Sequence, residues 1–342
     1  MSKNTTASGE ESPANAAVDA TSGLGIRRHF ERFGLLWILV AVIGVFSALE
    51  PSTFATTGNF TSILQEQSVL ACLALGLMFP IAVGEFDVSL GYVVGFTAVE
   101  GDALVEKAHL GGELAIILTI ATGLAIGLVN GLFVTRFKVH SLIATLGVGF
   151  GVNSLTIGVS GSQTLFMGVP HFLSQAANST PLFGIAGAVW IVFAIAIVLY
   201  LVLQFTPYGR KIYAVGGSER VSRLAGIRTR LVKTSAFVVA GGLAAVAGLL
   251  QLAETGGANP DFGIPLLLPA FAAVFLGATA IRPGYFNVWG TLIAIGVLAV
   301  GFAGLNLDGV PFWVEPMYDG VLLLGAVLLA REEARSIGRS LT

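Results

Sequence analysis

Residues that could carry catalytic chemistry are few, and none is arranged for catalysis. The four histidines are scattered without a metal-ligand spacing, and no H-E-x-x-H motif occurs. The sequence contains no G-x-x-x-x-G-K-[ST] phosphate-binding loop and no Gly-Lys dipeptide, so the chain has no visible means of hydrolysing ATP. Cys72 is the only cysteine, which excludes an internal disulfide and a cysteine-rich metal site. The sequence therefore predicts neither an enzyme nor a metal or cofactor bound by this chain.

One acidic residue stands at a break between apolar stretches. Asp87 precedes Val88-Ser89-Leu90, where it would cap a helix by accepting hydrogen bonds from free N–H groups. Alternatively, its carboxylate would line a pathway and bind solute hydroxyls. An ionisable group at membrane depth costs about 2.5 to 3.5 kcal/mol and so needs such a reason. We favour the cap, because the topology derived below places this break toward the cytoplasm.

Uncharged polar residues within or at the ends of apolar stretches have two interpretations. Each can hydrogen-bond to a neighbouring helix, which is the commoner use, or face a translocation pathway. The pathway candidates are Asp87, Ser89, Asn130, Asn153 and Asn306, and the same two interpretations apply to Gln163 and Gln251.

The composition indicates which solvent surrounds these residues. Of the 342 residues, 55% are hydrophobic and 11% are charged, and the mean hydropathy is +0.85; a typical globular chain has roughly 25% charged residues. Too few charges are present to cover a water-soluble surface, so we expect a multi-pass membrane protein in a lipid bilayer. The net charge of −2 does not indicate a nucleic-acid partner.

The uncharged stretches of the sequence can be compared with the roughly 17 to 25 residues that a spanning helix needs. Eight stretches are strong candidates: 33–49, 67–84, 114–134, 141–161, 181–205, 234–253, 262–281 and 283–307. Two further stretches, 88–99 and 317–330, are weaker candidates, because acidic residues interrupt or shorten them.

The basic residues decide between eight and ten crossings, since Lys and Arg in short loops stay in the cytoplasm. With ten crossings, 17 of the 18 Lys and Arg residues lie on the cytoplasmic side and only Lys107 lies outside. Without the two weaker stretches, basic loops would fall on opposite sides of the membrane. We therefore predict an all-α protein with about ten transmembrane helices and both termini in the cytoplasm.

The two ends differ from the apolar region between them. Residues 1–33 are rich in small polar residues and end in three arginines, which predicts a disordered cytoplasmic tail. A cleaved signal peptide is the alternative, but the chain stays apolar afterwards. The apolar membrane-spanning domain would span 34–330, and 331–342 would form a cytoplasmic tail.

Glycine and alanine are abundant in the apolar stretches, with 44 glycines in the chain. Small residues let helices approach closely in lipid, so we expect packing rather than a flexible pore lining in the runs 147–151 and 241–248. Two short Gly-rich junctions, 84–91 and 284–290, are similar, but the similarity is too weak to predict an internal repeat.

The cytoplasmic segment 206–231 is the most informative feature of the sequence. We expect Gly216 and Gly217 to form a turn, Ser218 to cap a short helix and Gly226 to end it. That helix would carry Val221, Leu224 and Ala225 on one side. By spacing alone, this face either lies on anionic headgroups or docks into a groove on a partner protein.

The residues of this segment resemble a known family. The run Gly209-Arg-Lys-Ile-Tyr-Ala-Val-Gly-Gly-Ser-Glu-Arg-Val-Ser-Arg-Leu-Ala-Gly-Ile227 is similar to the coupling segment of the ribose-type sugar ABC importer permeases. Three further stretches resemble the same family in order: 84–91, 141–147, and 288–293 followed by Gly304-Leu-Asn306. The likeness extends over roughly residues 35 to 330.

The resemblance implies a permease of the bacterial inner (plasma) membrane that moves a sugar or sugar-like solute. It implies two cytoplasmic ABC ATPase domains that bind ATP and Mg, an extracytoplasmic solute-binding protein, and a second permease copy or homologue. The residues that would contact the ATPase are Gly209, Arg210, Glu219, Arg223, Leu224 and Gly226.

Several positions depart from the family pattern. Glu85 and Phe86 stand where the family usually has Gly and Ile, the run 282–286 replaces a glycine-rich turn, and Pro269 replaces a common Asp. These changes leave pentose, hexose, polyol and nucleoside-like solutes open. The main rival function is an ion-coupled secondary transporter in which Asp87 or Glu66 binds the coupling ion, although mid-membrane carboxylates are scarce. A third possibility is a scaffolding membrane subunit without a pathway.

Overall fold

The computed structural model describes residues 33–339 except 167, 308 and 312, and in this part of the chain it is built from helices, with isolated β-bridges only. The helix Phe33–Leu49 comes first. The following helices are α2 (Thr57–Glu66), α3 (Ser68–Ala82), α4 (Leu90–Glu106), α5 (Gly112–Thr135), α6 (Ser141–Ser160), α7 (His171–Asn178), α8 (Gly187–Phe205), α9 (Pro207–Gly217), α10 (Glu219–Leu224), α11 (Thr229–Thr255), α12 (Leu267–Gly277), α13 (Val288–Leu307) and α14 (Val314–Arg339).

Several of these helices are long and apolar enough to cross a membrane. Five helices meet that criterion by themselves, namely α5, α6, α8, α11 and α13, and α2 with α3 forms a sixth candidate that is bent by 42°. All ten stretches predicted from the sequence contain helix. The prediction of an all-helical, polytopic membrane protein is therefore confirmed.

Some boundaries differ from those predicted. Helix α4 continues past Val99 to Glu106 because its acidic residues have donors: the Thr122 hydroxyl donates to Glu100 (2.8 Å) and the Gly168 N–H donates to Asp102 (3.0 Å). Helix α14 likewise continues beyond residue 330, to Arg339.

Helix α12 is shorter than the predicted stretch 262–281. It ends at Gly277, and the chain then turns before α13 begins. The Asn287 side chain stabilises this turn by donating to the carbonyl oxygens of Gly277 (3.2 Å) and Ala280 (3.0 Å). Helix α12 can therefore end early, because the Asn287 side chain satisfies carbonyl oxygens that would otherwise need partners within the helix.

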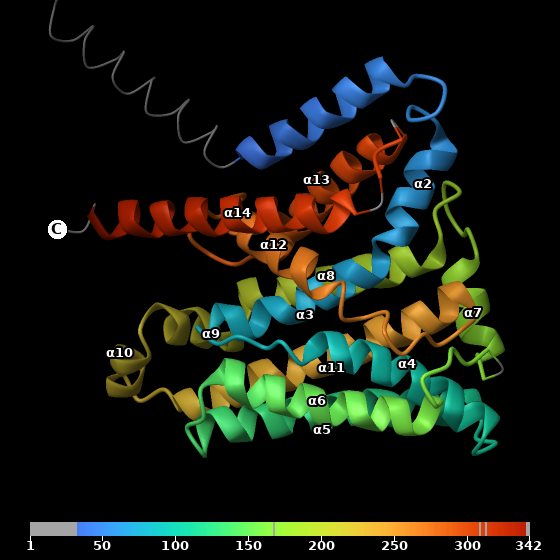
Figure 1. Ribbon diagram of the computed structural model, residues 1–342. Coiled ribbons are helices and arrows are strands. Elements are labelled where there is room, and N and C mark those ends of the chain that lie inside the picture. Colours follow the sequence, from blue (N-terminus) through green and yellow to red (C-terminus); the bar gives the residue numbers. More distant parts are fainter. Residues whose placement is uncertain (1–32, 167, 308, 312, 340–342) are drawn as a thin grey trace, which may run out of the picture.

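The helices form a bundle with two distinct ends (Figure 1). Helices α9 and α10 lie at one end, where α14 also terminates, and α2 and α7 lie at the other. Helix α11 runs between these ends and packs against α3, α4 and α5. The bundle therefore has a central helix that contacts both ends.

Glycines let α5 and α11 approach at backbone distance. A Cβ added at Gly241 would lie 2.2 Å from the carbonyl oxygen of Gly123, and one added at Gly127 would lie 2.3 Å from that of Phe237. Packing is thus confirmed for the run 241–248. In the run 147–151 packing is confirmed at Gly149, where a Cβ would lie 2.7 Å from the Tyr92 ring. Gly147 and Gly151 have no neighbouring atom within 4 Å of such a Cβ, so these two glycines do not serve close packing within the chain.

One glycine in each of the two Gly-rich junctions has the same backbone conformation. Gly84-Glu-Phe-Asp-Val88 precedes α4, and Gly284-Tyr-Phe-Asn-Val288 leads into α13. Gly84 has φ +82° and Gly284 has φ +81°, a left-handed conformation that favours glycine. Each junction therefore uses a glycine to turn the chain before a helix.

Candidate functional site: the coupling end and the polar clusters

The segment that joins α8 to α11 is built from two capped helices. The Thr206 hydroxyl accepts from Gly209 N–H at the start of α9 (3.4 Å), and the Ser218 hydroxyl accepts from Val221 N–H at the start of α10 (3.3 Å). Gly226, with φ +81°, follows the end of α10. The predicted cap and stop of this short helix are therefore confirmed.

The predicted turn at Gly216 and Gly217 is wrong, because both residues belong to α9. Gly216 is needed for a different reason: a Cβ there would lie 1.9 Å from the carbonyl oxygen of Ala82, at the end of α3. Close approach rather than a turn requires this glycine, and it brings α9 against α3.

The apolar side of α10 faces away from the protein. Leu224 is 83% exposed and Val221 is 63% exposed, and Ala225 beside them is exposed as well. In contrast, Ser222 on the opposite side is buried. An exposed apolar face at the tip of the bundle is typical of a protein or membrane contact.

An ion-pair network attaches α10 to the body of the protein. Lys233, near the start of α11, donates to Glu219 (2.6 Å) and to Glu85 (2.7 Å), and Arg223 donates to Glu219 (3.1 Å). The side chains of Lys233 and Glu85 are only 14% and 16% exposed. Lys233 therefore links α10 to the junction between α3 and α4.

The carboxylate of Glu219 has an altered pKa. The hydrogen bond from Lys233 holds the pKa of Glu219 below its usual value, against the opposing effect of partial burial. A lowered pKa in the folded state adds stability above the unfolded pKa, and this contribution is lost as the pH falls through the folded value. The ion pair should therefore persist at pH 5.

We expect this persistence to appear in thermal unfolding of the purified protein. The difference in Tm between wild type and Glu219→Gln should stay constant from about pH 7 to about pH 5 and shrink below about pH 4, since unperturbed glutamate titrates near 4.3. A difference that grows as the pH falls would contradict the direction of the shift.

A buried polar cluster lies at the adjacent junction. Asp87 accepts from the Ser89 N–H (3.0 Å) and from the Ser89 hydroxyl (2.6 Å), and Asn130 of α5 donates to the Ser89 hydroxyl (2.7 Å). All three side chains are fully buried. The N-cap residue of α4 is Ser89 and not Asp87. Asp87 supports the start of the helix indirectly, by accepting hydrogen bonds from Ser89.

The structure brings together only some of the predicted site residues. Asp87, Ser89 and Asn130 form one cluster, whereas Asn153 is half-buried on α6 and Asn306 is exposed near the end of α13. Arg210 is exposed on α9, beside Gly209, whose Cβ position lies 2.0 Å from the carbonyl oxygen of Leu203. Whether any of these residues meets a solute or a partner stays a prediction.

Sequence reasoning missed Lys233 and assigned no role to Glu85. The two residues are 148 positions apart in the sequence, so no local pattern connects them. The one signal that could have indicated the pair is that Glu85 departs from the family pattern, because an acidic residue near a membrane boundary requires a basic partner.

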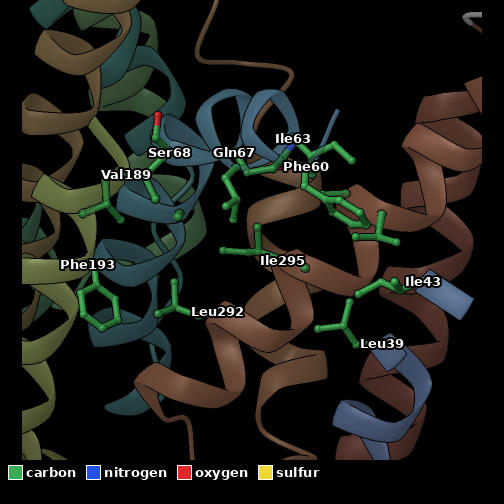
Figure 2. Close-up of a pocket in the computed structure, with 16 residues that line it drawn as sticks. Leu39, Ile43, Phe60, Ile63, Gln67, Ser68, Val189, Phe193, Leu292 and Ile295 are labelled. Carbon is green, nitrogen blue, oxygen red and sulfur yellow. The ribbon is translucent and has the colours of Figure 1, made fainter. Parts of the chain in front are cut away.

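An apolar cavity of about 330 Å³ lies among the helix Phe33–Leu49, α2, α3, α8 and α13. Figure 2 shows its aliphatic and aromatic lining, including Leu39, Ile295 and Phe193, with Gln67 and Ser68 at one side. A site for a hydroxylated solute needs several convergent polar groups. This cavity therefore does not suit such a solute.

Comparison with known proteins identifies what the chain is similar to. Residues 59–330 match the family model for the branched-chain amino acid transport system / permease component. The ribose import permease protein RbsC of Escherichia coli (strain K12) is 33% identical over 89% of this chain and 96% of its own length. The L-arabinose ABC transporter permease protein AraH of Azospirillum brasilense is 26% identical over 93% of this chain and 92% of its own. No solved structure matches the chain.

Proposed function

Because the chain belongs to the branched-chain amino acid transport system / permease component family, we propose that it is the membrane subunit of an ATP-binding cassette importer for a sugar or sugar-like solute. The family makes it a multi-pass bacterial membrane permease and not an enzyme. The observation that carries the sugar assignment is the similarity to RbsC along 89% of the chain. A relative named as a D-allose transport system permease, AlsC of Escherichia coli (strain K12), is 28% identical over 88% of the chain.

The proposed topology has ten crossings with both termini in the cytoplasm. Support comes from the placement of basic residues: Lys138, Arg223, Arg230 and Lys233 line one cavity at the α10 end of the bundle. Lys107 lies elsewhere, at the end of α4, where it donates to the carbonyl oxygen of Val159. This asymmetry agrees with a cytoplasmic location of the α10 end.

The proposed partners are two cytoplasmic ABC ATPase domains, an extracytoplasmic solute-binding protein and a second permease copy or homologue. ATP and Mg would bind to the ATPase partners. ATP-driven closure of those partners would move α9 and α10, and the Lys233 ion pairs would transmit this movement to the α3–α4 junction. The exposed apolar face of α10 supports this assignment, because Leu224 is 83% exposed beside charged neighbours.

A substitution at the tip of α10 tests the proposed ATPase contact. Leu224→Asp should weaken co-purification of the ATPase subunits at least about 30-fold, since a central apolar anchor contributes about 2 kcal/mol or more. Phe183→Asp is the matched control: Phe183 is 87% exposed and has a positive φ that aspartate tolerates.

The two variants give distinct outcomes. Undiminished co-purification of the ATPase with Leu224→Asp would contradict the contact, as would an equal loss with Phe183→Asp. If the ATPase still binds Leu224→Asp, and α10 of this variant contacts anionic lipid vesicles more weakly than α10 of the wild type, the headgroup interpretation is supported instead.

A further inference from the structure

A polar cavity of about 490 Å³ opens at the end of the bundle opposite α10. Its lining comes from α2, from the start of α3, from the end of α11, from the segment before α12 and from the start of α14. The lining includes Glu66, Gln251, Glu254, Phe262 and Glu315. Cavities of this volume bind small molecules.

One lining residue is fixed in place and has an unused acceptor. Gln251 is 2% exposed, and its amide nitrogen donates to the Thr255 hydroxyl and to the Gly257 carbonyl, each at 3.1 Å. Its amide oxygen is buried and has no hydrogen-bond partner among the described residues. A buried acceptor left unpaired costs about 1 to 3 kcal/mol, so a ligand donor that reached this oxygen through a small movement of the side chain would be favourable.

Neighbouring residues add further acceptors and an apolar surface. Glu254 is held by a hydrogen bond from the Ser68 hydroxyl of α3, and Glu66 and Glu315 are exposed at the opening. Phe262 is half-buried in the same lining. Carboxylate and amide oxygens accept hydrogen bonds from hydroxyl groups, while an aromatic ring packs against C–H groups.

The charges in the lining restrict the solute. Three carboxylates line the cavity, and among the described residues no lysine, arginine or histidine does so. An anionic solute such as a sugar phosphate would meet uncompensated repulsion. A neutral polyhydroxylated solute would instead supply the donors that these acceptors lack.

Two helices connect this cavity to the coupling end. Helix α11 carries Lys233 near its start and Glu254 near its end, and α3 carries Ser68 at its start and Ala82 beside Gly216 of α9. A shift of α9 or α10 would therefore reach both walls of the cavity through continuous helices.

We propose that this cavity, the outer chamber, is where the permease itself binds a neutral polyhydroxylated solute, with Gln251 and Glu254 accepting from its hydroxyl groups. The proposal rests on the proposed importer function and adds a solute site within the permease. It implies that the permease discriminates against anionic solutes independently of the binding protein.

Site-directed labelling tests the chamber in the full importer in proteoliposomes. Cys72 is buried, and Cys72→Ser provides a cysteine-free parent. Ser62→Cys places a thiol on an exposed chamber residue, and Ser179→Cys places one at an exposed position at the end of α7, outside the chamber lining. The rate of reaction with a membrane-impermeant thiol reagent is measured with the binding protein present, with and without sugar. The probe is whichever neutral sugar, polyol or nucleoside the parent imports with ATP, beginning with ribose, L-arabinose and D-allose.

We expect sugar to slow labelling of Ser62→Cys at least about fivefold and to leave Ser179→Cys unchanged. If the binding protein without sugar slows labelling of Ser62→Cys as much as it does with sugar, the chamber is a protein-docking surface and the proposal is overturned. The same labelling rate in all conditions would also overturn the proposal. Protection by ribose 5-phosphate equal to that by the neutral sugar would overturn the charge argument. If the parent imports no neutral sugar, polyol or nucleoside with ATP, the proposed function fails instead, and uptake of such a solute without protection of Ser62→Cys refutes the chamber alone.

Discussion

Replacing Gly241 by leucine is expected to prevent accumulation of the folded permease. A Cβ at this position would lie 2.2 Å from the Gly123 carbonyl oxygen and 3.0 Å from the Gly127 backbone nitrogen. Both neighbours are backbone atoms of α5, so no rotamer change relieves the overlap. Overpacking of a well-packed core typically costs about 1 to 3 kcal/mol and occasionally more, against a total stability of about 5 to 15 kcal/mol.

Size-exclusion chromatography and thermal unfolding of the detergent-solubilised protein measure this effect. We expect little or no monodisperse Gly241→Leu protein and a lowered Tm for Gly241→Ala. Gly151→Leu is the control, because a Cβ at Gly151 has no neighbour within 4 Å. A normal yield of Gly241→Leu, or an equal loss in Gly151→Leu, would show that the contact between α5 and α11 does not hold the bundle together.

Replacing Lys233 by methionine is expected to uncouple the permease from its ATPase. The substitution keeps an unbranched apolar side chain, one atom shorter than lysine, but leaves the Glu85 carboxylate, 16% exposed, without its cation. Removing one partner of a buried pair costs about 3 to 5 kcal/mol, and partial exposure reduces the expected loss to about 2 kcal/mol. We expect at least a tenfold fall in ATP-dependent uptake.

Removing the charge of Glu85 as well separates the loss of the link to α10 from a simple loss of stability. Glu85→Gln combined with Lys233→Met should recover most of the lost Tm but not uptake, because the link between α10 and the α3–α4 junction stays broken. Arg230→Met is the control, since Arg230 lines the same cavity and is exposed. Full recovery of uptake in the double variant would show that Lys233 acts only by balancing the charge of Glu85.

Local chemistry in the sequence predicts the helices and their ends well. Ser218 and Gly226 delimit α10 as expected, because a hydroxyl cap and a left-handed glycine act within a few residues. The apolar stretches likewise locate the helices, because each must bury its own backbone hydrogen bonds in lipid. The orientation of the bundle in the membrane remains a prediction from the basic residues.

Contacts between distant segments could not be predicted from one sequence. Lys233 meets Glu85 because α11 packs on α3, and Glu85 follows the end of α3. Gly216, which the sequence alone suggests is a turn residue, instead lets α9 approach the end of α3. For Gln251 the sequence leaves two alternatives open, a helix contact or a pathway group. Its amide nitrogen makes local hydrogen bonds while its oxygen stays unpaired, which only the three-dimensional structure reveals.

In the proposed importer, this chain moves a sugar only when an ATPase drives it. The most direct measurement is uptake of radiolabelled ribose, L-arabinose and D-allose into proteoliposomes that contain the permease, its ATPase subunits and its binding protein. We predict uptake that requires ATP and that stops when the ATPase or the binding protein is omitted. Uptake by the permease alone, driven only by a proton or sodium gradient, would contradict this account and identify a secondary transporter.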